Sequence, residues 1–143
     1  MKRFAAFLAV VTLVACAPRH RTEVVPALSG PARPFSPAVK ANGFIWLSGQ
    51  IGTDSTGARI VPGGIQAETR QTMNNIRDIL TRAGSSMDKV VKCTVFILDM
   101  AEWPAMNEVY ITYFKGPPPA RSAAGASGLA LGARVEIECI AAQ

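Results

Sequence analysis

Arg121 is the most distinctive candidate for chemistry in this sequence. It follows Pro117-Pro118-Pro119 and is the lone cation among the small side chains from Ala120 to Ser127. Small neighbours leave a hollow beside the guanidinium, which can then bind a carboxylate through two parallel hydrogen bonds. The alternative interpretation is a surface or interface arginine that pairs with a nearby glutamate.

Two carboxylates near the C-terminus form the second candidate group. Glu136 and Glu138 alternate with apolar residues in the stretch Val135–Cys139. Successive side chains of a strand point to opposite faces, so both carboxylates are expected on one face. One of them can orient or deprotonate a water for attack on a carbon–nitrogen double bond. Alternatively, both are solvated or pair with Arg134.

Other catalytic chemistries find little support in the composition. The chain has one histidine, His20, and three cysteines that are not spaced as zinc ligands. This argues against a metal centre and against a histidine-activated nucleophile. No glycine-rich loop of the P-loop or dinucleotide-binding type is present. The sequence therefore predicts neither a metal nor a cofactor.

The N-terminus has the layout of an exported lipoprotein. A short basic start precedes the uncharged run Phe4–Val14, which is too short to span a bilayer. The run ends in Leu13-Val14-Ala15-Cys16, which resembles a bacterial lipobox. We expect a signal peptide over residues 1–15, lipidation of Cys16, and anchoring in the bacterial cell envelope, on the periplasmic side of the outer membrane. A plain secretory signal and an unprocessed N-terminal helix are the alternatives.

The rest of the chain divides into a tether and one domain. Residues 16–33 contain several prolines and no hydrophobic period, which predicts a lipidated cysteine followed by a flexible tether. Residues 34–143 are expected to form the folded domain. The formal net charge is +5, but the basic residues form no dense run with stacking aromatics. Nucleic acid is therefore not an expected partner.

Hydrophobic patterning predicts an α+β fold. Residues 65–83 form an amphipathic helix, and the apolar runs at 44–51 and 90–98 are typical of strands covered on both faces. The remaining predicted elements are a helix at 102–114 and strands at 120–127 and 134–140. Both helices would cover one face of the sheet, and the other face is too apolar for water. We therefore expect the chain to oligomerise through that face.

Cys93 and Cys139 are the remaining cysteines if Cys16 carries lipid. Both lie in apolar, strand-like runs, which favours buried free thiols. An oxidising compartment leaves a disulfide between them open as the alternative.

Five short motifs stand in a defined order along the chain. They are Leu47-Ser48-Gly49-Gln50-Ile51, Val91-Lys92-Cys93-Thr94-Val95-Phe96, Asn107 followed by Tyr110, Pro119-Ala120-Arg121-Ser122, and Val135-Glu136-Ile137-Glu138. Together they resemble the Rid (reactive intermediate deaminase) family, some members of which are named L-PSP endoribonucleases. The resemblance runs from Pro34 to Ala142, and the ordered set is more specific than any single motif.

This resemblance implies a chorismate-mutase-like fold, a mixed sheet with two helices on one face, assembled as a homotrimeric barrel with a site in each cleft between subunits. It also implies that Arg121 binds the substrate carboxylate, that Glu136 orients the hydrolytic water and that Glu138 supports it. The other implied substrate contacts are Ser48, Gly49, Asn107 and the backbone at Ala123.

Two positions depart from the pattern of many family members. Ala123 stands where members often have cysteine, which speaks against thiol chemistry. Phe35 stands where many have tyrosine, so a phenol that could bind substrate or water is missing. Phe35 can still shape the pocket, and altered specificity, a reduced rate and inactivity are all consistent with this change.

The implied activity is the cofactor-free hydrolysis of 2-imino acids or their enamines to 2-oxo acids and ammonia. A non-catalytic trimeric module that binds small 2-oxo acids or similar carboxylates is the main alternative, because it needs Arg121 but not Glu136. Endoribonuclease activity is disfavoured because the chain has no basic stacking surface. The expected partners are a small imino or oxo acid, two further copies of the chain, and the membrane through lipid alone.

Overall fold

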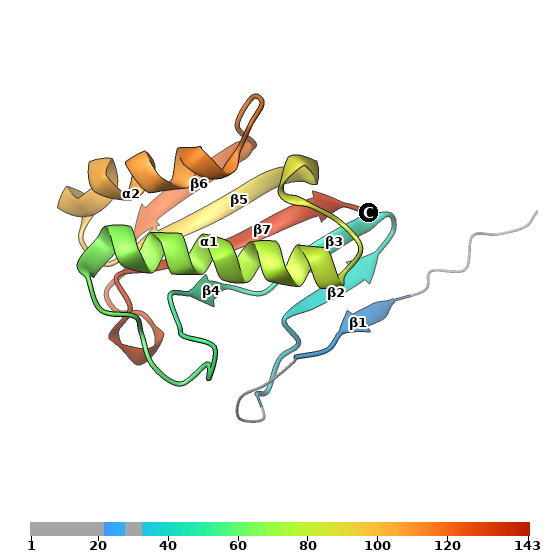
Figure 1. Cartoon of the computed structure of the whole chain (residues 1–143), viewed down its shortest axis with the longest axis horizontal. Coiled ribbons are helices and arrows are strands. Elements are labelled where there is room, and N and C mark those ends of the chain that lie inside the picture. The colour runs from blue at the N-terminus through green and yellow to red at the C-terminus, as the bar shows by residue number, and fades with distance from the viewer. Residues whose placement is uncertain (1–21, 28–32) are drawn as a thin grey trace, which may run out of the picture.

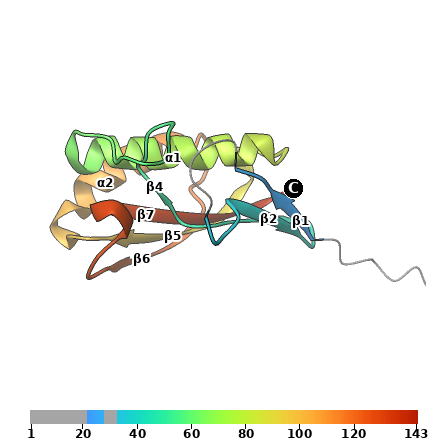
Figure 2. The same ribbon diagram turned by 90° about the horizontal axis from the view of Figure 1, so that it is seen from below.

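The structure is a computed structural model that describes residues 22–27 and 33–143. The predicted signal peptide, the lipidation site Cys16 and His20 lie outside the described residues. The elements of the described ranges form two layers, with both α-helices on one face of a mixed sheet (Figures 1 and 2). This arrangement is the predicted α+β fold.

The sheet of the described residues has seven strands in the order β1-β2-β3-β7-β5-β6, with β4 paired to β7. The strands are β1 Glu23–Val25, β2 Ala38–Ala41, β3 Phe44–Leu47, β4 Gln50–Ile51, β5 Val90–Ile97, β6 Ala120–Gly125 and β7 Val135–Ala142. β5 and β6 are parallel, and the other pairs are antiparallel. The parallel pair requires a crossover connection, and the second helix provides it.

The two helices are α1, Gly64–Arg82, and α2, Trp103–Tyr110. The apolar stripe of α1 is buried against the sheet, where Met73, Ile76 and Leu80 are completely inaccessible to solvent. Pro104 lies in the first turn of α2, where its missing N–H has no helical partner to lose. Short 3₁₀ turns at Met100–Glu102 and Ile111–Tyr113 flank α2. The α-helix is therefore shorter at both ends than the predicted range 102–114.

The expected flexible tether is wrong for residues 23–25. These residues form β1, which pairs with β2 at the sheet edge, and Val25 is buried. Lys40 Nζ also donates a hydrogen bond to Glu23 Oε1 at 3.0 Å. β1 and β2 escaped prediction because strands of three and four residues are too short to display a hydrophobic period.

β3 is covered on one face within a single chain, and its other face is the one for which we expect a cover from another copy of the chain. Ile45 and Leu47 are buried under the helices, whereas Phe44 and Trp46 remain 40% and 50% exposed. Trp46 lies opposite Ile140 of β7, on the face that the helices leave open (Figure 2). A second copy that covers this face is consistent with the apolar composition and remains a proposal.

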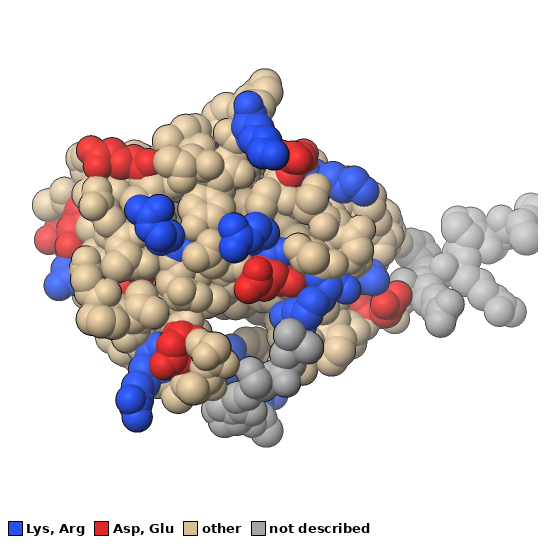
Figure 3. Space-filling view, in the orientation of Figure 1, with Lys and Arg blue, Asp and Glu red and all other residues tan. Residues whose placement is uncertain are grey.

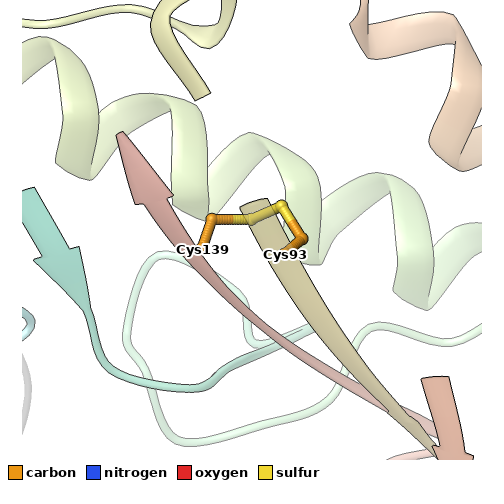
Figure 4. Close-up of a disulfide and its surroundings, with 2 residues drawn as sticks. All are labelled: Cys93 and Cys139. Atoms are coloured by element: carbon orange, nitrogen blue, oxygen red, sulfur yellow. A yellow bond between two sulfur atoms is a disulfide. The ribbon is translucent and has the colours of Figure 1, made fainter. Parts of the chain in front are cut away.

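Cys93 and Cys139 form a disulfide (Figure 4). They lie directly opposite each other on β5 and β7, with Cα atoms 4.1 Å apart, and both are buried. The predicted burial is confirmed, and the favoured free thiols are wrong. The two cysteines are 46 positions apart in the sequence, so the sequence does not reveal the strand register that brings the sulfur atoms together.

Candidate active site

Arg121 lies on the edge strand β6 and is held by side chains of α2. Its Nη1 donates a hydrogen bond to Asn107 Oδ1 at 2.7 Å. Its Cζ is 4.8 Å from the centre of the Tyr110 ring and 5.4 Å from that of Trp103. Cation–π contacts of this kind favour a positive charge. Within the described residues of one chain no carboxylate pairs with Arg121.

A hollow of about 510 Å³ opens beside this guanidinium, and we call it the arginine hollow. Its lining includes Arg121, Asn107, Tyr110, Ile111, Pro118 and Pro119. Arg121 has five N–H donors, and the amide of Asn107 accepts from one of its nitrogens. The guanidinium can therefore offer further donors to a carboxylate ligand in the hollow.

Tyr110 contributes an apolar ring to this hollow. Burial raises the pKa of Tyr110 to about 12, and the nearby Arg121 charge opposes that rise. The buried hydroxyl oxygen has no hydrogen-bond partner among the described residues. Tyr110 therefore remains a neutral phenol at physiological pH and contacts the Arg121 guanidinium through the face of its ring.

Glu136 lies on the central strand β7, opposite Ile51 of β4 and Phe96 of β5. Its carboxylate rests against Gly49: a Cβ at this glycine would collide with Oε1 and lie 2.8 Å from Cδ. Any side chain at position 49 would thus displace the carboxylate. Gly49 and Glu136, both of which the family resemblance implies for the site, are therefore in contact.

The environment of Glu136 disfavours its charged form. Desolvation raises the pKa of this carboxyl group above its usual value, and the charge of Glu138 adds to the rise. A carboxylate of raised pKa accepts a proton from water more readily than an ordinary one. Glu138 itself is exposed and lies opposite Thr94, so its influence on Glu136 is electrostatic.

Glu136 opens into a second hollow of about 500 Å³, which we call the glutamate hollow. Its lining includes Glu136, Gly49, Phe35, Ile51, Ala130 and Leu131. Ser48 does not line it. The hydroxyl of Ser48 donates instead to the backbone oxygen of Ser36 at 2.7 Å. This hydrogen bond holds the segment that carries Phe35 close to Ser48-Gly49-Gln50.

Within one chain the two hollows belong to opposite faces of the sheet. Arg121 is in register with Cys93, which lies opposite Cys139 under the helices. Side chains alternate along a strand, so Glu136, three residues from Cys139, points to the other face. Arg121 and Glu136 therefore cannot reach the same small molecule from a single chain.

The other predicted contacts divide between the two faces. Asn107 joins Arg121, while Gly49 and Phe35 join Glu136. Ala123 is on the Arg121 face of β6 and packs against the core without lining the arginine hollow. The contacts of Trp103 and Tyr110 with Arg121 were not predicted from the sequence, although the spacing 103, 107, 110 places both residues with Asn107 on one face of a helix.

Among the described residues, no three His, Cys, Asp or Glu side chains gather in a way that could hold a metal ion. No helix in those ranges has the length and apolar character needed to cross a membrane. On the helix-bearing face in Figure 3, basic and acidic side chains are interspersed rather than gathered into one basic surface.

Comparisons with known proteins match this fold and these motifs. The family model described as "Endoribonuclease L-PSP" matches residues 26–143. A 2-iminobutanoate/2-iminopropanoate deaminase from Mus musculus is 43% identical over 122 residues, which are 85% of this chain and 88% of the mouse protein. The Reactive Intermediate Deaminase A of Arabidopsis thaliana is 39% identical over 120 residues, 84% of this chain and 63% of that protein.

Solved structures agree with the predicted fold class. A protein of the conserved Rid family from Yersinia pestis superposes with a TM-score of 0.80 at 38% identity, over 86% of this chain and 100% of that one. The structure of TdcF from E. coli with bound serine has a TM-score of 0.78 at 28% identity, over 85% of this chain and 98% of that one. The α+β fold with a mixed sheet and two helices on one face is thereby confirmed.

Proposed function

Because this chain belongs to the endoribonuclease L-PSP family, which includes the Rid proteins, we propose that it hydrolyses 2-imino acids and their enamines to 2-oxo acids and ammonia, without a cofactor. The observation that carries the proposal is the Arg121 guanidinium, which α2 holds in an open hollow and no described carboxylate neutralises. Relatives named 2-iminobutanoate/2-iminopropanoate deaminase support the same reaction class.

The complete site lies between two copies of the chain. Arg121 and Glu136 point to opposite faces, so the arginine hollow of one copy must meet the glutamate hollow of its neighbour. A heterologous contact of this kind closes into a ring when the rotation between copies fits. The proposed ring is a homotrimer whose open sheet faces, with Phe44 and Trp46, point inward.

In this site the substrate carboxylate binds Arg121 and leaves the imine carbon beside a water held by Glu136. The water oxygen bonds to that carbon while Glu136 takes one proton from the water, the C=N π pair moves to nitrogen, and solvent supplies the proton that nitrogen gains. Glu136 then gives its proton to the nitrogen of the carbinolamine, the C–N bond breaks and ammonia leaves. The hydroxyl group loses its proton to solvent as the C=O bond forms. Positioning and a fixed charge supply the acceleration, and no electron acceptor is needed.

A binding module without turnover is the second candidate. The observation in its favour is that a relative of the same fold, TdcF, was solved with serine bound, and binding a small carboxylate requires the arginine hollow alone. On this alternative, substitutions at Glu136 leave ligand affinity unchanged.

The experiment measures 2-oxo acid release from 2-iminopropanoate, generated in situ by an amino-acid oxidase, with the purified full chain. Arg121→Ala and Glu136→Gln are each expected to lower the enzymatic rate at least about 100-fold. Arg77→Ala, an exposed arginine outside both hollows, is the matched control and should retain the full rate. A wild-type rate equal to that of buffer would favour the binding module.

We also propose the envelope location on the sequence of residues 1–16. Growth of a bacterial host with an alkyne fatty acid should label the wild-type chain and not Cys16→Ser. Equal labelling of both chains, or labelling of neither, would contradict lipidation at this cysteine.

A further inference from the structure

The glutamate hollow has an apolar wall that attack on an imine carbon does not by itself require. Phe35, Ile51, Ala130 and Leu131 line the same hollow as Glu136. Phe35 and Leu131 leave 48% and 62% of their surface exposed. Large apolar side chains that stay exposed beside a polar group are typical of ligand sites.

Leu131 is held there by an unusual backbone. Its φ is 56° and its ψ is 18°, the left-handed conformation, which branched side chains rarely adopt. The turn that imposes it is closed by hydrogen bonds from the N–H groups of Gly132 and Ala133 to the backbone oxygens of Leu129 and Ala130, at 3.2 and 3.1 Å. It runs directly into β7, which carries Glu136. Strained residues of this kind cluster at ligand clamps.

Phe35 is positioned independently by a second set of contacts. The backbone N–H of Ser48 donates to the oxygen of Pro37 at 3.0 Å, and the Ser48 hydroxyl donates to Ser36. The Arg33 guanidinium lies 5.8 Å from the centre of the Phe35 ring. The ring is thus fixed relative to Gly49 and Glu136, and without a hydroxyl it offers only apolar contact.

We propose that this wall, formed by Phe35 and Leu131, receives the side chain of the substrate and selects 2-imino acids with bulky apolar side chains over small ones. The inference rests on the proposed hydrolysis and names its substrate class. A leucine- or phenylalanine-derived side chain covers the exposed ring and isobutyl group. An acidic side chain would meet the Arg33 guanidinium as well as the carboxylate of Glu136, because both line this hollow. A glutamate-derived imine therefore reports on charge, and the alanine- and leucine-derived imines report on the apolar wall.

The magnitude follows from the apolar area that the side chain covers. Each fully buried methylene changes kcat/KM about fourfold. A leucine-derived imine carries three more carbons than 2-iminopropanoate, and the hollow is open to solvent on one side. We therefore expect about a tenfold preference in kcat/KM for the leucine-derived imine.

The test compares kcat/KM of the full chain on imines generated from alanine, leucine and glutamate. Leu131→Asn replaces the apolar side chain by a polar one that tolerates the left-handed conformation. Leu131→Gly removes the side chain and with it the backbone strain of that conformation. Leu98→Asn makes the same chemical change at an exposed leucine that lines neither hollow. Thermal melting of each variant checks that the fold is retained.

The wild type and Leu98→Asn should prefer the leucine-derived imine about tenfold, and both Leu131 variants should reduce this ratio to about twofold or less. Equal kcat/KM for all three imines, or an unchanged ratio in the Leu131 variants, would overturn the apolar selection while leaving hydrolysis intact. If the wild type accelerates none of the three, hydrolysis and selection both fall.

Discussion

The two hollows of this chain are built in contrasting ways. The arginine hollow depends on side chains that are present: an amide and two aromatic rings from α2 contact the guanidinium of Arg121. The glutamate hollow is built by omission, because the carboxylate of Glu136 occupies the space that a side chain at position 49 would fill. We therefore expect the arginine hollow to tolerate the loss of one neighbouring side chain better than the glutamate hollow tolerates an added methyl group at position 49.

The two hollows also respond differently to protons. The arginine hollow contributes a fixed positive charge, whereas burial and Glu138 raise the pKa of the Glu136 carboxyl group. The proposed roles of the two hollows, carboxylate binding and water activation, are thus separated in space and in their dependence on pH.

The largest expected effect concerns the covalent link between the strands that support the two hollows. Replacing Cys93 and Cys139 together by alanine should lower the free energy of unfolding by about 3 kcal/mol, because the disulfide restrains the unfolded chain. Urea unfolding of the double variant beside the wild type measures this. A double variant as stable as the wild type would show that the strands hold their register without the bond.

Gly49→Ala should have the next largest effect. The new methyl group collides with Glu136 and displaces its carboxylate, so kcat should fall about 100-fold. Gly116→Ala is the control, because a Cβ there meets no atom within 4 Å. If Gly49→Ala kept the wild-type kcat, the glutamate hollow would not depend on the missing side chain.

Asn107→Ala should act on binding more than on chemistry. The variant removes the 2.7 Å hydrogen bond to Arg121 but leaves both aromatic rings, so KM should rise about tenfold with a smaller change in kcat. A large fall in kcat with unchanged KM would mean that Asn107 touches the reacting atoms.

The smallest effect is a pH dependence in which activity and stability move in opposite directions. Because the folded-state pKa of Glu136 is raised, its contribution to stability is present below its unfolded value and is lost as pH rises through the folded value. The active form is the ionised one, so kcat should rise over the same interval. Glu136→Gln should remove this part of the pH dependence of Tm, and an identical Tm profile in both chains would contradict the assignment.

Much of the fold could be predicted because it is encoded locally. The stripe of α1 and the apolar runs of β5 and β7 are each long enough to show a period, and the chemistry of Arg121 and Glu136 follows from their residue types. β1 and β2 are too short for such a signal. The apolar run of β3 predicts a strand covered on both faces, but such a run looks the same whether a helix or another copy of the chain provides the cover.

The division of the candidate site could not be predicted, because it depends on register between distant strands. Nothing near Arg121 in the sequence reveals that it lies beside Cys93 rather than one residue away, where its side chain would point to the face of Glu136. The same holds for the disulfide. Trp103 and Tyr110 look like core residues of a helix until β6 places a cation beside them.

In the proposed ring, the opposed faces of Arg121 and Glu136 predict complementation between two inactive alleles. A chain with Arg121→Ala retains Glu136, and a chain with Glu136→Gln retains Arg121. Two inactive variants can therefore complement each other in one assembly. In mixed rings assembled at random from equal amounts, about one contact in four joins the two intact halves. Co-expression should then recover about a quarter of the wild-type rate from partners that are each inactive alone.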